Sequence, residues 1–223
     1  MHIFGTIYNI FLSHIMGKHA DSIDRTILRR IQSHGRAWVF TPSHFDDIAG
    51  SSTITTTLKR HTDAGTIRSL ARGLYDYPKT DPQLGTLLPS TDDIARALAG
   101  RDEIRLQPSG AYAANRLGLS TQVPMKVVYL TDGRSKTVQI GNRQIILKQT
   151  TPRNMAAAGK ISGLIIQALK HLGKDQVDGE VIKTLDSRLD DAGRKQLMGD
   201  IRSAPAWIAD IFRQLSKTKG SVQ

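Results

Sequence analysis

The stretch that decides the fold of the N-terminal part is residues 43–77, SHFDDIAGSSTITTTLKRHTDAGTIRSLARGLYDY. Its pattern predicts a short helix, a turn at Gly50 and a second helix, which Ser51 or Ser52 caps and Gly65 ends. After this helix, the alternation of apolar and polar residues predicts two short strands joined by a tight turn. Two helices joined by a turn and followed by a β-hairpin are typical of a winged helix-turn-helix.

The second helix of this stretch is predicted to have one buried and one exposed face. Ile54 and Leu58 share a face with His61 or Thr62, so this face is expected to pack against the rest of the domain. The opposite face carries hydroxyl groups near the helix start and cations further along, groups that suit base edges and phosphate oxygens. With two arginines of the hairpin, the residues predicted to contact DNA are Ser52, Thr53, Thr56, Lys59, Arg60, Arg68 and Arg72. The alternative is a helical hairpin whose hydroxyl-rich face is only solvated.

Composition restricts the partners and the chemistry of the chain. Its 223 residues carry a formal net charge of +11, which favours a polyanionic partner such as nucleic acid or an acidic protein. A basic surface that only confers solubility is the alternative. The absence of cysteine excludes disulfides, thiolate nucleophiles and Cys-ligated zinc sites, and it fits the reducing cytoplasm, where we expect the protein to be located.

The chain begins with an apolar segment that we expect to lie outside the folded part. Residues 1–15 lack the basic region and the cleavage site of a signal peptide and are too short to span a bilayer, so no membrane association is expected. The composition changes abruptly at Met16, which we expect to be the biological start. Residues 1–17 are then a disordered or non-native extension, and an added amphipathic arm is the alternative.

We predict an α+β protein with two domains. The winged helix-turn-helix spans residues 18–80 and starts with a supporting helix from Ser22. Residues 81–90 are rich in Pro, Gly and Asp and are predicted to be a linker. A mixed α/β domain follows over residues 91–216, and residues 217–223 form a basic tail.

The second domain is predicted to centre on an antiparallel β-meander with helices after it. Turn residues separate three apolar segments, which are expected to be strands over 125–131, 136–140 and 144–149. After Pro152 the pattern is helical throughout, beginning with a long helix over residues 155–172.

Several segments in both domains resemble one known family. They are DAGTIR at 63–68 and RGLY at 72–75 in the first domain, and PSGAYAANRLGLSTQVP at 108–124 and VVYLT at 127–131 in the second. In this order they are similar to the AbiEi-type antitoxins of bacterial type IV toxin–antitoxin systems. The similarity covers roughly residues 18–172.

The resemblance implies two functions. The winged domain would bind promoter DNA of its own operon and repress it, and the second domain would counter a nucleotidyltransferase-like toxin encoded alongside, with or without direct contact. The far C-terminal part matches poorly, so no antitoxin residues are assigned. Two alternatives stay open: a plain winged-helix transcription factor whose second domain binds a ligand or dimerises, and an interaction protein whose winged module binds only protein.

The sequence carries no pattern typical of an enzyme. The carboxylate pairs at 46–47, 92–93 and 190–191 lie at predicted helix starts, where acids favour the helix dipole. The histidines lack the spacing of metal ligands, and no phosphate-binding loop is present. No Asp-x-Asp follows Gly50-Ser51, so the chain is not itself predicted to be the nucleotidyltransferase. We expect no catalytic residues, no metal site and no cofactor.

Overall fold

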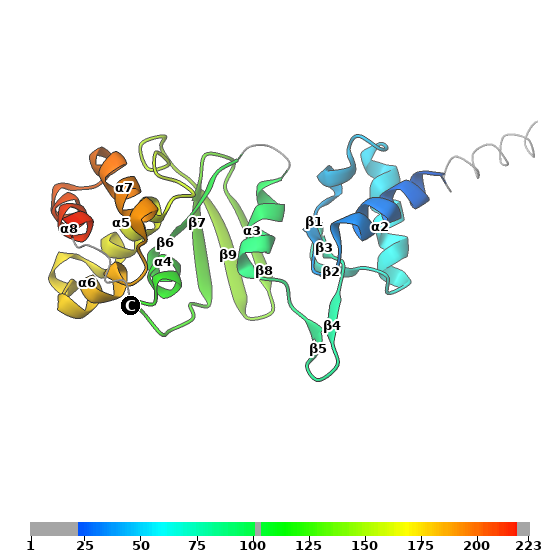
Figure 1. The fold of residues 1–223 in the computed structure, drawn as a ribbon. Coiled ribbons are helices and arrows are strands. Elements are labelled where there is room, and N and C mark those ends of the chain that lie inside the picture. The colour runs from blue at the N-terminus through cyan, green and yellow to red at the C-terminus, as the bar shows by residue number, and fades with distance from the viewer. Residues whose placement is uncertain (1–21, 101–103, 218–223) are drawn as a thin grey trace, which may run out of the picture. The chain divides into compact units, whose positions relative to one another are not determined.

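The chain folds into an α+β protein whose elements fall into two units, divided after Gly100 (Figure 1). The computed structural model describes residues 22–100 and 104–217. The predicted extension over residues 1–17 lies outside the described residues, as does the tail after Lys217. The predicted α+β class is confirmed.

In the described part of the first unit, residues 22–34 are helical, close to the supporting helix that the apolar spacing predicts. Three short strands then form one antiparallel sheet in the order β1-β3-β2, and two helical segments lie between β1 and β2 in the chain. These elements are β1 (Val39–Phe40), the 3-10 helix η1 (Pro42–Phe45), α2 (Ser51–Asp63), β2 (Arg68–Ala71) and β3 (Leu74–Asp76). The short helix predicted from Ser43 is therefore the single turn η1.

One apolar core joins these elements. Its fully or almost fully buried members are Ile27, Ile31, Phe40, Phe45, Ile54, Leu58 and Ile67. Burying a side chain such as Leu58 contributes about 1.5–3 kcal/mol, so this core is a main source of the stability of the unit. The predicted buried face of α2 is confirmed, because Ile54 and Leu58 are 0 % exposed and His61 is 8 % exposed.

The start of α2 differs from the prediction. Gly50 occupies the N-cap position, and no side chain caps the helix. A capping side chain belongs to the residue just before the first helical residue, which here is Gly50. Ser51 and Ser52 already lie within the helix, so neither can cap it. The prediction of a serine cap was therefore wrong.

Residues 81–90, which were predicted to be a linker, contain most of a β-hairpin and the N-cap of the next helix. Strands β4 (Lys79–Asp81) and β5 (Gly85–Leu87) pair antiparallel, and the carboxylate Oδ1 of Asp81 accepts from the backbone N–H groups of Gln83 and Leu84 at 2.8 and 2.9 Å. The bond from Leu84, followed by that from Gln83, lowers the pKa of Asp81. Two backbone bonds on one carboxylate thus order a turn that composition suggested was irregular.

Helix α3 (Thr91–Ala99) closes the first unit, although residues from 91 onward were predicted to belong to the second. Ser90 caps the helix by accepting from the N–H of Asp93 at 3.1 Å. The helix contacts β1, and Ile94 and Leu98 are buried. Burial of this apolar face explains why the helix stays with the elements before it.

The second unit contains a four-stranded sheet in the order β6-β7-β9-β8. The strands are β6 (Leu106–Ser109), β7 (Lys126–Thr131), β8 (Lys136–Ile140) and β9 (Arg143–Gln149). The pairs β6–β7 and β8–β9 are antiparallel, whereas β7 and β9 run parallel. The predicted antiparallel meander is therefore wrong in its pairing, although the three strands lie where they were predicted.

Burial explains why β9 rather than β8 lies beside β7. Strand β9 places the buried Ile145 and Leu147 opposite the buried Val127 and Tyr129 of β7. In β8 only Val138 is buried, and the strand is otherwise exposed or half-buried. An interior position suits a strand with more apolar surface to cover, and an edge suits a polar strand.

Helices cover one face of this sheet, as Figure 1 shows. A core of buried residues from α4, α5, α6, α7 and α8 joins them, including Leu117, Ile165, Leu197 and Phe212. The bounds are α4 (Gly110–Leu117), α5 (Ile161–Leu172), η2 (Lys174–Gln176), α6 (Gly179–Asp186), α7 (Asp191–Gly199), η3 (Ile201–Ser203) and α8 (Ala206–Lys217).

Helix α5 is shorter at its N-terminus than the predicted 155–172 helix. Residues 152–159 form turns, and Gly159 adopts a positive φ of 77°, which a continuous right-handed helix does not allow. In the described part of the chain, no helix has the length and apolar character that crossing a membrane requires.

Candidate nucleic-acid interface

Helix α2 presents one polar, exposed face that contains most of the predicted site. All five predicted contact residues of this helix are exposed, whereas Ile54, Thr57, Leu58 and His61 point into the unit. The exposed residues are Ser52, Thr53, Thr56, Lys59 and Arg60. Ser52, Thr53, Thr56 and Arg60, with Thr57, also line a shallow hollow of about 260 Å³. The predicted division of the helix into two faces is therefore confirmed.

The N-terminus of α2 offers backbone donors. The backbone hydrogen bonds of the helix start at Ile54, whose N–H donates to the carbonyl of Gly50 at 3.1 Å. Among the described residues, the amides of Ser51, Ser52 and Thr53 have no hydrogen-bond partner, and the first turn contains no acidic residue. The unpaired amides and the helix dipole favour an anion such as a phosphate at this end.

The hydroxyl groups on α2 differ in what they can still do. The hydroxyl of Thr56 donates to the carbonyl of Ser52 at 2.9 Å, and that of Thr55 donates to Ser51 at 2.8 Å. A threonine hydroxyl has one hydrogen, so after this bond the Thr56 oxygen can only accept. This limits the partners of Thr56 on DNA to hydrogen-bond donors.

The two cations of α2 are both paired with carboxylates at the surface. Lys59 Nζ donates to Asp63 Oδ2 at 2.9 Å, and this hydrogen bond raises the pKa of Lys59. Arg60 pairs with Asp24 of the first helix. Exposed pairs of this kind contribute little to stability, so the cations can exchange a carboxylate for a phosphate at small cost.

Asp24 also lies close to His61. The ring Nε2 of His61 is 3.1 Å from Asp24 Oδ1 but makes no hydrogen bond of acceptable geometry within the described structure. A hydrogen bond weakens steeply when it is misaligned, so this short contact contributes little. Asp24 therefore interacts mainly with Arg60, and sequence analysis missed it because the two residues belong to different helices.

The two predicted arginines of the β2–β3 hairpin have different environments. Arg68 donates from Nε and Nη2 to Asp76, at 3.0 and 2.5 Å, and from Nη2 to the carbonyl of Leu87 at 2.9 Å. Arg72 is exposed at the turn, which Gly73 completes with a positive φ of 71°, and it has no hydrogen-bond or ion-pair partner in the described part of the chain. Arg72 at the hairpin tip can therefore bind another molecule, whereas the guanidinium of Arg68 is occupied by contacts within the unit.

The carboxylate pairs considered for catalysis have structural partners. Asp190 caps α7 by accepting from Gly193 N–H at 2.7 Å, and Asp92 and Asp93 lie in the first turn of α3. Asp47 instead accepts two bonds from Arg30, at 2.8 and 2.7 Å, so its predicted role at a helix start was wrong. Within residues 22–100 and 104–217, no group of three His, Asp or Glu residues could hold a metal ion.

Helix α5 of the second unit borders a very small hollow. Its lining includes Arg153, Gln167 and Lys170, and its volume is about 10 Å³. A space of this size holds about one water molecule. This hollow does not provide the large apolar pocket that a ligand-binding second domain would require.

Comparison with known proteins places most of both units in one family. The model of a family described as "Family of unknown function (DUF6088)" matches residues 26–197. A search of the curated proteins found no match.

Proposed function

Because the chain belongs to the DUF6088 family, a family of unknown function, we propose a function from its own residues and from the resemblance stated above. The proposed function is that of a DNA-binding autorepressor that is also the antitoxin of a type IV toxin–antitoxin system. In this proposal the first unit is a winged helix-turn-helix that binds promoter DNA of its own operon. The second unit counters a nucleotidyltransferase-like toxin.

The connectivity of the first unit supports the winged-helix assignment. A helix, a strand, two helical segments and a β-hairpin follow one another, and the sheet order β1-β3-β2 brings the hairpin beside the first strand. In a winged helix-turn-helix the second helix of the pair enters the major groove, where base edges can be read. Here that helix is α2, and the β2–β3 hairpin is the wing.

The exposed face of α2 is the observation that carries the DNA-binding proposal. Its hydroxyls lie beside unpaired helix amides, and its cations lie further along the same helix. Ser52 and Thr53 would meet base edges or phosphates, Thr56 would accept from a base amino group, and Lys59 and Arg60 would meet phosphates. Arg72 would contact the DNA backbone from the wing. Arg68 is left out of this interface because Asp76 and Leu87 already bind its guanidinium.

The antitoxin part rests on the resemblance to AbiEi-type antitoxins. The similar segment 108–124 contains the end of β6, all of α4 and the loop that leads to β7. Helix α4 packs on α5 and contacts the sheet, so the similar segment is central to the second unit. The net charge of +11 supports an anionic partner for the chain but does not identify a toxin-binding surface.

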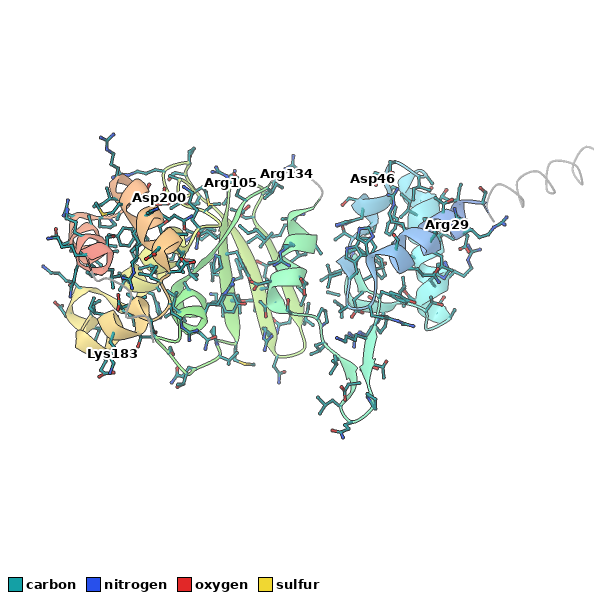
Figure 2. All side chains as sticks on the ribbon, viewed as in Figure 1. Arg29, Asp46, Arg105, Arg134, Lys183 and Asp200 are labelled. Carbon is teal, nitrogen blue, oxygen red and sulfur yellow. The ribbon has the colours of Figure 1, made fainter. Side chains whose placement is uncertain are left out.

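The test of DNA binding is a salt titration of the full chain on the DNA upstream of its own gene. We expect tight binding whose logarithm falls linearly with the logarithm of salt concentration. Lys59→Ala and Arg72→Ala should each reduce this slope by about one unit, because each removes one phosphate contact. The matched control is Lys183→Ala, which removes an exposed cation from α6 of the second unit (Figure 2).

Two outcomes would contradict the DNA-binding proposal. One is the absence of preference for the upstream DNA over unrelated DNA, and the other is an equal slope for all three variants. The antitoxin part is tested separately by co-expression with the toxin gene of the same operon. Growth restored by the full chain supports it, and continued arrest with a well-folded chain contradicts it.

A further inference from the structure

A cavity in the first unit lies apart from the exposed face of α2. It has a volume of about 440 Å³, which is within the range of small-molecule sites. It is bordered by the segment that joins the first helix to β1, by η1 and by α3. The lining residues that carry the argument are His34, Arg36, Ala37, Trp38, Asp93 and Arg96.

Aromatic rings give this cavity a flat wall. The ring of His34 stacks on Trp38 with centroids 3.9 Å apart and an interplanar angle of 12°. Trp38 in turn stacks on Phe40 at 4.7 Å, and His44 meets its edge at 5.7 Å. Stacked rings held in this way form a rigid platform for another planar ring.

The orientation and hydrogen-bonding capacity of His34 are fixed. Its Nδ1 lies 2.9 Å from the carbonyl of Arg30. A carbonyl oxygen only accepts, so Nδ1 carries the hydrogen, and in the neutral ring Nε2 is an acceptor. The bond from Nδ1 therefore holds the imidazole in one orientation, as a stacking surface requires.

The charged groups of the cavity favour an anion. The cavity is lined by two guanidinium groups, those of Arg36 and Arg96, and by one carboxylate, that of Asp93. The oxygens of Asp93 accept from Arg96 and from the hydroxyl of Ser90, each at 2.6 Å, so this carboxylate is already satisfied. Arg36 donates to the carbonyl of Pro78 at 3.1 Å and lies over Tyr77 at 4.0 Å, contacts that hold it without neutralising its charge.

Backbone strain occurs at the same place. Ala37 has a φ of 72° and is the only non-glycine residue with a positive φ among residues 22–100 and 104–217. Its N–H donates to the carbonyl of Tyr77 at 2.7 Å, which holds this conformation. A left-handed conformation is unfavourable for alanine because of its Cβ, and such strain is concentrated at ligand sites and switch regions.

We propose that this cavity binds a small planar heteroaromatic anion, the chemistry of a nucleotide, with the ring against His34 and the anionic group at Arg36 and Arg96. Guanidinium groups bind phosphate and carboxylate with the same fork geometry. An aromatic carboxylate is therefore a second source of this chemistry. The site goes beyond the proposed DNA binding and does not depend on it.

The experiment uses Trp38 as the reporter. The chain has two tryptophans, so Trp207→Phe leaves Trp38 as the only one. The full chain with this substitution is titrated with the four nucleoside 5′-monophosphates, with their uncharged nucleosides and with indole-3-carboxylate. Calorimetry on the wild-type chain accompanies the fluorescence. We expect saturable quenching by at least one of the anions at concentrations up to about 10 mM, and weaker quenching by the uncharged nucleosides.

Two arginine variants provide the decisive comparison. Arg96 pairs with Asp93 three residues earlier, and Arg213 of α8 pairs with Asp210 in the same way. Arg96→Ala should weaken binding of the anion by about tenfold or more, and Arg213→Ala should leave it unchanged. The unfolding midpoint of each variant confirms that it is folded.

The outcomes separate the two ligand sources and can reject the site. Saturation by nucleotides or by indole-3-carboxylate supports the proposal and identifies the source of the anionic group. The site is rejected if none of the anions quenches Trp38 saturably, if nucleosides bind as well as nucleotides, or if Arg96→Ala and Arg213→Ala bind equally well.

Discussion

Arg68 and Asp76 form a bidentate ion pair in which the carboxylate is almost fully buried. Asp76 is 1 % exposed, and it accepts from Nε and Nη2 of Arg68 at 3.0 and 2.5 Å. The same guanidinium donates to the carbonyl of Leu87 at 2.9 Å. One side chain therefore joins the β2–β3 hairpin to the β4–β5 hairpin.

Arg68→Ala should destabilise the protein because it leaves a buried carboxylate without its partner. The expected loss in free energy of unfolding is about 3 kcal/mol, measured by urea denaturation. Arg72→Ala is the matched control in the same hairpin and should change stability by no more than about 0.5 kcal/mol. Equal stability of the two variants would show that the pair with Asp76 is not structural.

Thr56→Val should change the base preference of the chain on its operator. The Thr56 oxygen can only accept, so on a base it would bind the amino group of adenine or cytosine. Valine keeps the shape and removes the acceptor, and we expect discrimination at one base pair to fall by about 1–3 kcal/mol.

This prediction is measured with operator variants in which each base pair is replaced in turn. Thr55→Val is the control, because Thr55 makes the same bond to the preceding turn but is not among the residues proposed to contact DNA. A change that occurs in both variants, or in neither, would place the contact elsewhere.

Asp24→Asn should strengthen DNA binding. It removes the carboxylate that pairs with Arg60, so the cation no longer has to exchange partners before it meets a phosphate. We expect tighter binding and a salt dependence steeper by up to about one unit. Asp175→Asn removes one exposed acid from the second unit and serves as the control for the change in net charge. If both variants respond alike, Arg60 has no specific role.

Asp132→Asn should have an effect on stability that depends on pH. The side-chain hydrogen bond from Arg105, at 2.8 Å, is the main cause of the lowered pKa of Asp132. A lowered pKa in the folded state means that the contribution is present at neutral pH and disappears as the pH falls through that pKa.

The group is partly exposed, so the expected difference in unfolding free energy between wild type and Asp132→Asn is at most about 1 kcal/mol near neutral pH. The difference should shrink toward zero at an acidic pH below the lowered pKa, where the wild-type carboxylate is protonated. Urea denaturation at both pH values measures it. A difference that does not vary with pH would assign the effect to lost packing or hydrogen bonding rather than to charge.

Gly163→Ala should destabilise the second unit. A Cβ at this position would lie 2.1 Å from the carbonyl oxygen of Ala157 and 2.6 Å from Oε1 of Gln107. The backbone would have to move, and the expected loss is about 1–3 kcal/mol, although alanine is the better helix former. At Gly199 an added Cβ meets no atom within 4 Å, so Gly199→Ala should be neutral or slightly stabilising. Thermal unfolding of the two variants compares them directly.

Local patterns were sufficient to predict α2 and the faces of its residues. The spacing of Ile54 and Leu58 is a property of the helix itself, and the exposed hydroxyls and cations follow from it. The pair between Arg68 and Asp76 was also within reach, because the two residues are direct partners in the β2–β3 register. The two strands were predicted from the alternation of apolar and polar residues alone, and the opposite charges of Arg68 and Asp76 did not enter that prediction.

Local patterns do not predict which elements far apart in the sequence lie next to each other in the fold. Alternation identified β7, β8 and β9 as strands, but it does not specify which strand lies beside which. The pair between Arg60 and Asp24 likewise joins two helices whose packing is known only from the fold. The cavity beside Trp38 depends on α3, which sequence analysis assigned to the other domain.

The interior position of β9 has a consequence for self-association. The segment Ile145-Ile146-Leu147 has the apolar, uncharged composition of strands that aggregate when their edges are exposed. In the folded sheet β7 and β8 cover both of its edges. The outer strands are a four-residue β6 and a β8 that carries the exposed Lys136, Thr137 and Gln139, and short or charged edges resist the addition of another strand. While the β8–β9 hairpin is paired with β7, the aggregation-prone strand β9 therefore has no free edge with which another copy of the chain could pair.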